Sequence, residues 1–172
     1  MEKIIAYFVG GVLFSNSSEA MQLMKKSSFG ELVDSKVQYS LVEGLFLVKS
    51  KKMEVFVGSK KLSEDKIVGK FQRIDKKFSL KFVVFSDLRK KGYVVKTALK
   101  FGADFRVYDK GSRPGGKHAR WVVFVEREAS RFSWHDFSAK NRVANSTKKK
   151  LLLAIVDEES DVSYYEVGWI KP

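Results

Sequence analysis

The sequence has 172 residues, of which 44% are hydrophobic and 13% aromatic, enough for a buried core in one domain or two small ones. It has no cysteine and only two histidines, His118 and His135, which excludes disulfides and thiolate nucleophiles, makes a zinc or multi-histidine site implausible, and leads us to expect no metal and no cofactor. The 33 Lys and Arg residues against 20 Asp and Glu give a net charge of +13, which favours a polyanionic partner such as nucleic acid over a merely lysine-rich solvated surface.

The N-terminal half predicts a small α+β unit, residues 1–80. The apolar start is too short for a membrane span of about 20 residues and lacks a small-residue cleavage site, so we expect a cytoplasmic protein without membrane contact. The predicted elements are two strands within 1–14 around Gly10-Gly11, a helix capped by Ser17 or Ser18, a helix over 39–48, a strand over 53–57 and a helix over 63–73. Nothing in this half resembles an active site.

The C-terminal half, residues 81–172, predicts a mixed sheet with a helix packed on it. The run 78–85 fits either a strand or the start of a buried helix, and 86–92 reads as a helix ending at a glycine. The later predicted elements are strands over 93–97, 105–108 and 121–126, a helix from Ser133 to about Lys148, a buried strand over 150–156, and a last strand over 162–170.

A glycine-rich, cationic loop, Asp109–Arg120, separates two of these strands and carries His118. An imidazole in such a loop can donate a proton to a leaving oxygen, although an arbitrary loop histidine is more often a plain surface residue. His135 is the weaker candidate, because it lies near the start of an amphipathic helix.

Tyr108 and Lys149 are the other residues that can do chemistry with His118. A strand-end tyrosine is usually structural, and its hydroxyl is a poor base unless nearby cations, here Lys110, Arg113, Lys117 or Lys149, stabilise the phenolate. Lys149 belongs to a lysine run that precedes an apolar strand, so at least one ammonium is held near buried backbone and can stabilise a phosphoryl transition state. A base, an acid and a cation fit attack by an RNA 2′-hydroxyl on its own phosphate, but the residue types do not show that the three converge.

Several ordered motifs of the C-terminal half resemble the archaeal tRNA-splicing endonucleases of the homotetrameric, short-subunit type. The motifs are Tyr93-Val94-Val95-Lys96-Thr97, Phe101-Gly102-Ala103-Asp104-Phe105-Arg106-Val107-Tyr108, Gly116-Lys117-His118-Ala119, and Arg142-Val143-Ala144-Asn145-Ser146 followed by Lys149. The similarity runs from about Asp87 to the C-terminus, and Tyr39–Val48 more weakly resembles a helix of the family's N-terminal domain.

The resemblance implies a restriction-endonuclease-like α/β fold for the C-terminal domain, and a role for each of three residues. Tyr108 would be the general base, His118 the general acid and Lys149 the cation that stabilises the transition state. Arg142 matches an arginine that clamps a bulged base by cation–π stacking, and Trp169 would be its aromatic partner.

The resemblance also implies a substrate and an assembly. The substrate would be precursor tRNA with a bulge–helix–bulge at the exon–intron boundaries, cut to a 2′,3′-cyclic phosphate and a 5′-hydroxyl. The chain would form a homotetramer, a dimer of dimers, in which the last strands pair subunits and the acidic turn enters a basic cleft of a neighbour. The acidic residues of that turn are Asp157, Glu158, Glu159 and Asp161. Without the family, a solvated β-turn would be the preferred interpretation.

Two other functions remain open from the residues. A metal-dependent nuclease needs a carboxylate pair and a lysine around Mg²⁺, and Asp104, Asp157 and Glu158 are the only tempting acids. A non-catalytic subunit or plain RNA-binding module would be expected to lack one of Tyr108, His118 and Lys149, and all three are present.

Overall fold

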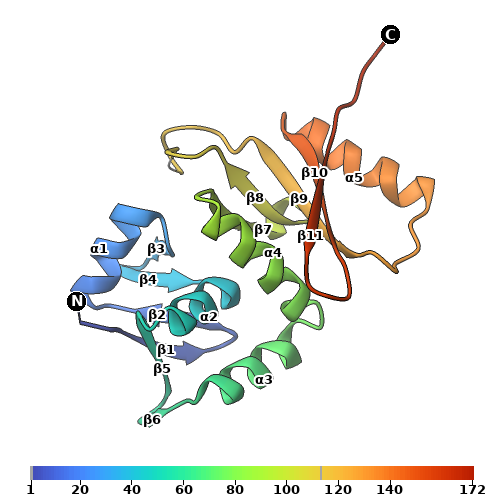
Figure 1. The fold of residues 1–172 in the computed structure, drawn as a ribbon. Helices are drawn as coiled ribbons and strands as arrows, with labels where there is room; N and C mark the ends of the chain where they lie inside the picture. Colours follow the sequence, from blue (N-terminus) through green and yellow to red (C-terminus); the bar gives the residue numbers. More distant parts are fainter. Residues whose placement is uncertain (1, 113) are drawn as a thin grey trace. The chain divides into compact units, whose positions relative to one another are not determined.

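The computed structural model describes residues 2–112 and 114–172 (Figure 1). The chain forms two compact units that divide between Ser79 and Leu80. Each unit has its own mixed sheet, so the two-domain architecture with mixed sheets that the sequence predicts is present. No helix within the described ranges is long and apolar enough to cross a membrane.

The first unit is built on a six-stranded sheet in the order β3-β4-β2-β1-β5-β6, in which only the β1–β5 pair is parallel. Its elements are β1 (Ile4–Val9), β2 (Val12–Ser15), α1 (Ser18–Ser27), β3 (Glu31–Val33), β4 (Lys36–Tyr39), α2 (Leu41–Lys49), β5 (Met53–Val57), β6 (Lys60–Lys61) and α3 (Glu64–Ile74).

Serine side chains cap the first two helices of this unit, Ser17 as the sequence predicts and Ser40 without having been predicted, whereas Ser63 makes no side-chain cap hydrogen bond at the start of α3. The hydroxyl of Ser17 accepts a hydrogen bond from the backbone N–H of Ala20 at 3.2 Å at the start of α1. Ser40 and Glu43 form a capping box at the start of α2, and the buried Glu43 carboxylate also accepts the N–H of Gly30 at 3.0 Å. Glu43 therefore ties the start of α2 to the turn before β3.

The β3–β4 hairpin is an element that the sequence analysis missed. Its turn places Asp34 and Ser35 at φ of 45° and 62°, a conformation that non-glycine residues seldom adopt, and no Gly or Pro marks it. The helix predicted over 39–48 instead begins at Leu41, because Tyr39 is the last residue of β4 and Ser40 is the cap.

The second unit is built on a five-stranded sheet in the order β11-β10-β9-β8-β7, in which β9 and β10 are parallel and all other pairs antiparallel. Its elements are α4 (Phe78–Lys90, which starts two residues before the division), β7 (Val94–Ala98), a 3₁₀ turn (Leu99–Phe101), β8 (Ala103–Tyr108), β9 (Trp121–Arg127), α5 (Trp134–Ser146), β10 (Lys150–Val156) and β11 (Val162–Val167).

This sheet is covered on both faces, which explains the continuous apolar run of β10. On one face Val122, Phe124 and Leu151 form a buried cluster with Ala144 of α5. On the other, the Phe105 ring contacts Phe85 of α4, with 6.0 Å between ring centroids. The Tyr164 hydroxyl of β11 donates to Asp87 of α4 at 2.6 Å, and burial together with this bond raises the pKa of the Tyr164 phenol.

The structure decides one open alternative of this unit and corrects two predicted boundaries. The run 78–85 is helical, since α4 is one continuous helix that buries Phe78, Val84 and Phe85. The α5 helix ends at Ser146 rather than about Lys148, and β11 ends at Val167 rather than Ile170. Trp169 therefore lies beyond the last strand.

Candidate active site

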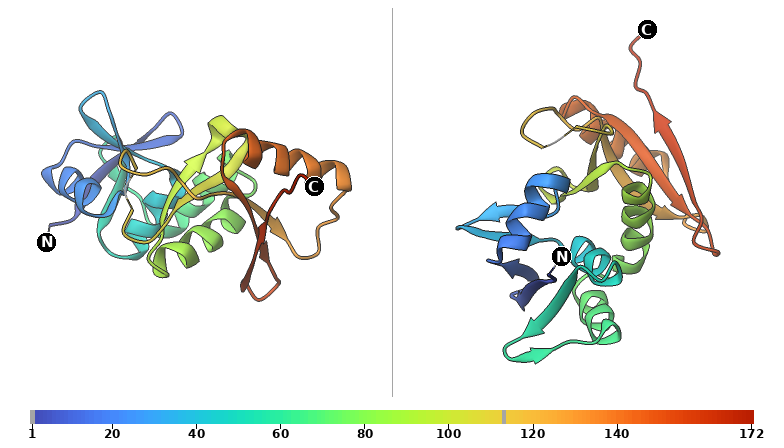
Figure 2. Two further views of the ribbon diagram at one scale, coloured as in Figure 1. Left: turned by 90° about the horizontal axis from the view of Figure 1, so that it is seen from above. Right: turned by 60° about the vertical axis from the view of Figure 1, so that its left-hand side comes forward.

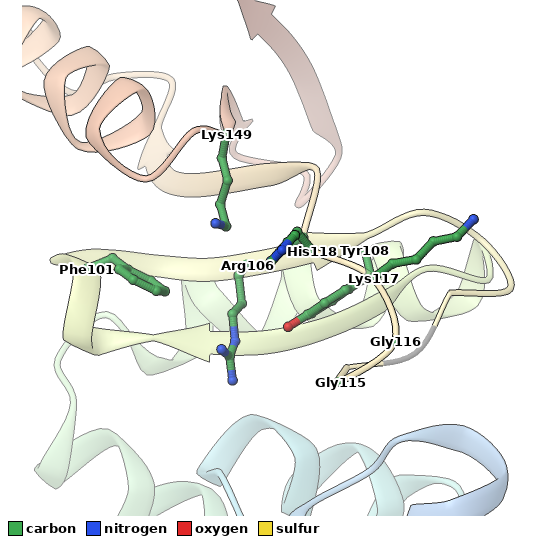
Figure 3. A pocket seen from close by; sticks show the side chains of 9 residues that line it. Phe101, Arg106, Tyr108, Gly115, Gly116, Lys117, His118 and Lys149 are labelled. Atoms are coloured by element: carbon green, nitrogen blue, oxygen red, sulfur yellow. The ribbon is translucent and has the colours of Figure 1, made fainter.

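A pocket of about 320 Å³ lies in the second unit, on the sheet face that α5 covers (Figure 3). Its lining brings together the three residues to which the sequence analysis gives catalytic roles, Tyr108, His118 and Lys149. They come from the end of β8, from the loop after it, and from the turn between α5 and β10. The complete lining is Phe101, Arg106, Tyr108, Gly115, Gly116, Lys117, His118, Ala119 and Lys149.

Tyr108 is held by the sheet. It is the last residue of β8, pairs with Val94 across the β7–β8 ladder, and is only 5% exposed. Its neighbour Val107 accepts the backbone N–H of Arg120 at 2.9 Å, so the ladder continues to the end of the following loop. Packing therefore fixes the phenol ring of Tyr108 at the lining of the pocket.

His118 sits on an exposed stretch of the loop between β8 and β9. Gly111 and Gly115 take φ values of 77° and 91°, which L side chains rarely adopt, so the turns of this loop need glycine. The next residue, Ala119, is buried and anchors the end of the loop. The His118 side chain can thus contact a ligand that arrives from solvent, while the buried Ala119 fixes the adjacent backbone. Arg113, one of the expected phenolate-stabilising cations, falls outside the described residues.

Lys149 is fixed by the way α5 ends. Lys148 adopts φ of 54°, which turns the chain out of the helix, and the N–H of Lys149 donates to the Ala144 carbonyl at 2.9 Å. The Lys149 ammonium donates to the Thr147 carbonyl at 2.9 Å and lies 5.5 Å from the centroid of the Phe101 ring. In Figure 3 this side chain extends toward the strand that carries Arg106 and Tyr108. Of the run Lys148-Lys149-Lys150, Lys149 is the residue that lines the pocket.

Arg106 is a pocket residue that the sequence analysis did not assign. It lies two residues before Tyr108 on β8, so strand alternation puts both side chains on the same face of the sheet. That spacing is the signal that predicts its position. With Lys117 and Lys149 it gives the lining three cationic residues and no carboxylate, a charge pattern that favours an anionic ligand such as a phosphate.

Arg142 and Trp169 are not among the residues that line this pocket. Arg142 is exposed on α5, and Trp169 is 64% exposed in the segment after β11. His135, the weaker histidine candidate, is exposed in the first turn of α5 and is also absent from the lining.

The acidic turn joins β10 to β11. The Asp157 carboxylate accepts the backbone N–H of Asp161 at 2.8 Å, and Ser160 takes a left-handed φ of 69°. Glu158, Glu159 and Asp161 are exposed at the tip of the hairpin, which projects from the sheet in both views of Figure 2. Asp157 therefore shapes the turn, and the other three carboxylates face solvent.

Of the acids considered for a metal-dependent nuclease, Asp104 and Asp157 are engaged in other contacts and Glu158 is exposed. The Asp104 carboxylate pairs with Lys81 at 3.2 Å and accepts the N–H of Val125 at 2.8 Å. Within residues 2–112 and 114–172, no group of three or more His, Asp or Glu side chains is placed to hold a metal ion.

Comparison with known proteins gives the same family for both units. Residues 4–68 match the family model of the tRNA intron endonuclease N-terminal domain, and residues 78–164 match that of the tRNA intron endonuclease catalytic C-terminal domain. A tRNA-splicing endonuclease of Thermococcus kodakarensis is 43% identical over 98% of this chain and 99% of its own length. Proteins with the same name are 38% identical in Pyrococcus abyssi, over 99% of both chains, and 35% identical in Methanothermobacter thermautotrophicus, over 94% of both chains.

Proposed function

The chain belongs to the tRNA intron endonuclease family and is a tRNA-splicing endonuclease, and we propose that it cuts precursor tRNA at bulge–helix–bulge exon–intron junctions by attack of an RNA 2′-hydroxyl. The observation that carries this mechanism is the single pocket lined by Tyr108, His118 and Lys149. A base, an acid and a cation around one phosphate are the groups that this reaction requires.

Each group has one part in the proposed chemistry. Tyr108, as the phenolate, takes the proton of the 2′-hydroxyl, and the new bond forms between the 2′-oxygen and phosphorus. His118 donates a proton to the 5′-oxygen as its bond to phosphorus breaks. Lys149 stabilises the extra negative charge of the transition state. The products are a 2′,3′-cyclic phosphate and a 5′-hydroxyl, and no step needs a metal ion.

The shape of the substrate supplies what the pocket requires. Attack in line with the leaving oxygen needs a backbone geometry that a stacked helix forbids and an extruded bulge nucleotide allows. In our proposal the exposed Arg142 stacks on such a nucleotide, with Trp169 as the aromatic partner. Because neither residue lines the pocket, both would contact RNA beside the scissile phosphate.

Two cuts in one precursor call for two symmetry-related sites, and we propose a homotetramer, a dimer of dimers paired through the C-terminal strands. The acidic turn would bind a basic surface of a neighbouring subunit. Support comes from a pocket of about 350 Å³ on α3, whose lining includes Lys66, Lys70 and Arg73 at helical spacing together with Asp65 and Gly69. These cations are opposite in charge to the exposed carboxylates of the acidic turn, so the two surfaces are complementary.

We assign the N-terminal α+β domain to residues 1–80 and the catalytic domain to 81–172, and we group the latter with restriction-endonuclease-like folds because a mixed five-stranded sheet lies between helices. We expect the reaction to take place in the cytoplasm.

A precursor tRNA with a single 2′-deoxy nucleotide at one scissile position tests the mechanism. The substitution removes the nucleophile and leaves every phosphate in place, so cleavage at that junction should stop while the other junction is still cut and affinity is unchanged. Continued cleavage at the deoxy position would refute 2′-hydroxyl attack and favour water as the nucleophile.

A further inference from the structure

A cluster of charged and aromatic side chains lies on the sheet face opposite the pocket, behind the ends of β8 and β9. Glu166 of β11 forms an ion pair with the Lys150 ammonium and accepts a hydrogen bond from the indole N–H of Trp121 at 2.7 Å. The Leu152–Glu166 and Leu152–Val123 pairs of the ladder put Glu166 on the same face as Trp121. The hydrogen bonds from Lys150 and Trp121 keep the pKa of the Glu166 carboxyl below its ordinary value.

Arg120 is the member of this cluster that joins the two ends of the catalytic loop. Its guanidinium donates to the Asp109 carboxylate at 3.3 Å, lies 3.6 Å from Glu166, and stacks 4.4 Å from the centroid of the Trp121 ring. Asp109 is the first residue of the loop and Arg120 the last. The guanidinium therefore closes the base of the loop that carries His118 and secures it to β11.

The cluster continues across the edge of the sheet. The Trp121 ring meets the Tyr93 ring edge-on, with 5.8 Å between centroids, and the Lys110 ammonium lies 5.1 Å from the centroid of Tyr93. Lys110 is the second residue of the loop, so the start of the loop is held by aromatic contacts as well as by the ion pair.

Every proposed catalytic residue is a near neighbour in sequence of a member of this cluster. Asp109 follows Tyr108, Arg120 is two residues after His118, and Lys150 follows Lys149. We propose that Arg120 is a positioning residue, whose contacts with Asp109, Glu166 and Trp121 hold the three catalytic side chains in register from behind the sheet. This role rests on the proposed function, because it concerns the geometry of that reaction.

The expected effect is moderate, since Arg120 and Asp109 are about half exposed and water screens their attraction. Arg120→Ala should lower the single-turnover cleavage rate at saturating protein about fivefold, which corresponds to about 1 kcal/mol. The dissociation constant for uncleaved 2′-deoxy RNA should change by less than about twofold, because the contact lies behind the phosphate site. Arg120→Lys keeps the charge but not the planar fork, and should recover only part of the rate.

The substitution Asp109→Asn distinguishes a positioning effect on the cleavage rate from an effect of charge alone. Removing a carboxylate near the pocket reduces repulsion of RNA phosphate, so electrostatics alone predicts equal or faster cleavage and tighter binding. Positioning predicts slower cleavage, by about the same factor as Arg120→Ala, and a double variant that is no slower than either single one. Arg127→Ala, at the other end of β9, is the matched control and should keep the wild-type rate.

Hydrogen exchange of the protein without RNA gives a readout independent of activity. In Arg120→Ala the amides of residues 115–119 should exchange several-fold faster than in the wild-type chain and in Arg127→Ala, at an unchanged melting temperature. Unchanged exchange, or additive rate losses in the double variant, would overturn the positioning role even if the wild-type chain cleaves RNA. A wild-type chain that does not cleave, with the exchange difference present, would instead count against the proposed function alone.

Discussion

At the scale of single residues, His118 combines an exposed side chain with a tethered backbone. The imidazole is open to solvent at the pocket, while Ala119 is buried and the N–H of Arg120 is bonded to Val107. Such a placement suits a group that must meet a leaving oxygen without reorganising. The histidine is therefore expected to act on the rate of cleavage more than on affinity.

His118→Ala should lower the single-turnover cleavage rate by about 10²–10⁴-fold, the range typical of a lost general acid. Affinity for 2′-deoxy precursor RNA should stay within a few-fold of wild type. Parallel rate and filter-binding measurements check both expectations. A variant that cleaves slowly only because it binds poorly would make His118 a binding residue.

Lys149 and Lys148 provide a matched pair for the role of the fixed ammonium. Lys149→Gln removes the only lysine of the run that lines the pocket within the described residues, and should slow cleavage by about 10²–10³-fold. Lys148→Gln removes the same charge from an exposed, left-handed position outside the lining and should have an effect below about threefold. Similar losses in both variants would point to general phosphate attraction instead of a located cation.

The sequence predicts the identity of these residues better than their geometry. The order of the motifs is enough to single out Tyr108 and His118 as candidate catalytic residues. Lys149 turns into the pocket because Lys148 adopts a left-handed conformation and the N–H of Lys149 donates to the Ala144 carbonyl. Backbone dihedrals at a helix end depend on what the next strand pairs with, and the residue pattern does not show that. Arg106 was predictable from the two-residue alternation with Tyr108.

At the scale of elements, two glycines lie inside helices in different surroundings: Gly44 is closely packed and Gly69 is not. A Cβ on Gly44 of α2 would lie 2.0 Å from Cδ1 of Leu13, a fully buried side chain of β2. Gly69 of α3 has nothing within 4 Å of its Cβ position. The two positions share a residue type and differ only in their surroundings.

Gly44→Ala should therefore lower the free energy of unfolding by about 1–3 kcal/mol, because overpacking outweighs the better helix propensity of alanine. Gly69→Ala should raise it by up to about 1 kcal/mol, since propensity acts there alone. Urea unfolding followed by circular dichroism measures both. Stabilisation by both substitutions would show that Leu13 can move aside.

Element prediction succeeds where local signals are strong and fails where the environment decides. Ser17 and Ser133 each accept a backbone N–H where the residue pattern predicts a helix start. The run 78–85 stays ambiguous because a helix buried among aromatic rings shows no polar alternation. The β3–β4 hairpin is missed because its exposed first strand has no buried face to give it a pattern.

At the scale of the whole molecule, the proposed tetramer depends on exposed carboxylates of an otherwise basic chain. The net charge of +13 would drive subunits apart unless opposite charges meet at their contacts. Glu158, Glu159 and Asp161 gather three negative charges at one hairpin tip, whereas Asp157 is needed to shape the turn.

Replacing Glu158 and Glu159 by Gln and Asp161 by Asn should convert tetramers to dimers in multi-angle light scattering, most readily at low salt. The matched control neutralises three other exposed acids, Glu2→Gln, Asp34→Asn and Glu128→Gln, and should keep the wild-type mass. A tetramer that survives the tip substitutions would leave the acidic turn as a solvated β-turn.

The central claim is a cyclising cleavage of bulged precursor tRNA by three side chains without a metal ion. The most direct test incubates the wild-type chain with end-labelled bulge–helix–bulge RNA in EDTA and maps both the cut positions and the phosphate chemistry of the ends. We expect cuts in both bulges, with a 2′,3′-cyclic phosphate on one side of each cut and a 5′-hydroxyl on the other. Cleavage that appears only when Mg²⁺ is restored, or that leaves 5′-phosphate ends, would contradict it.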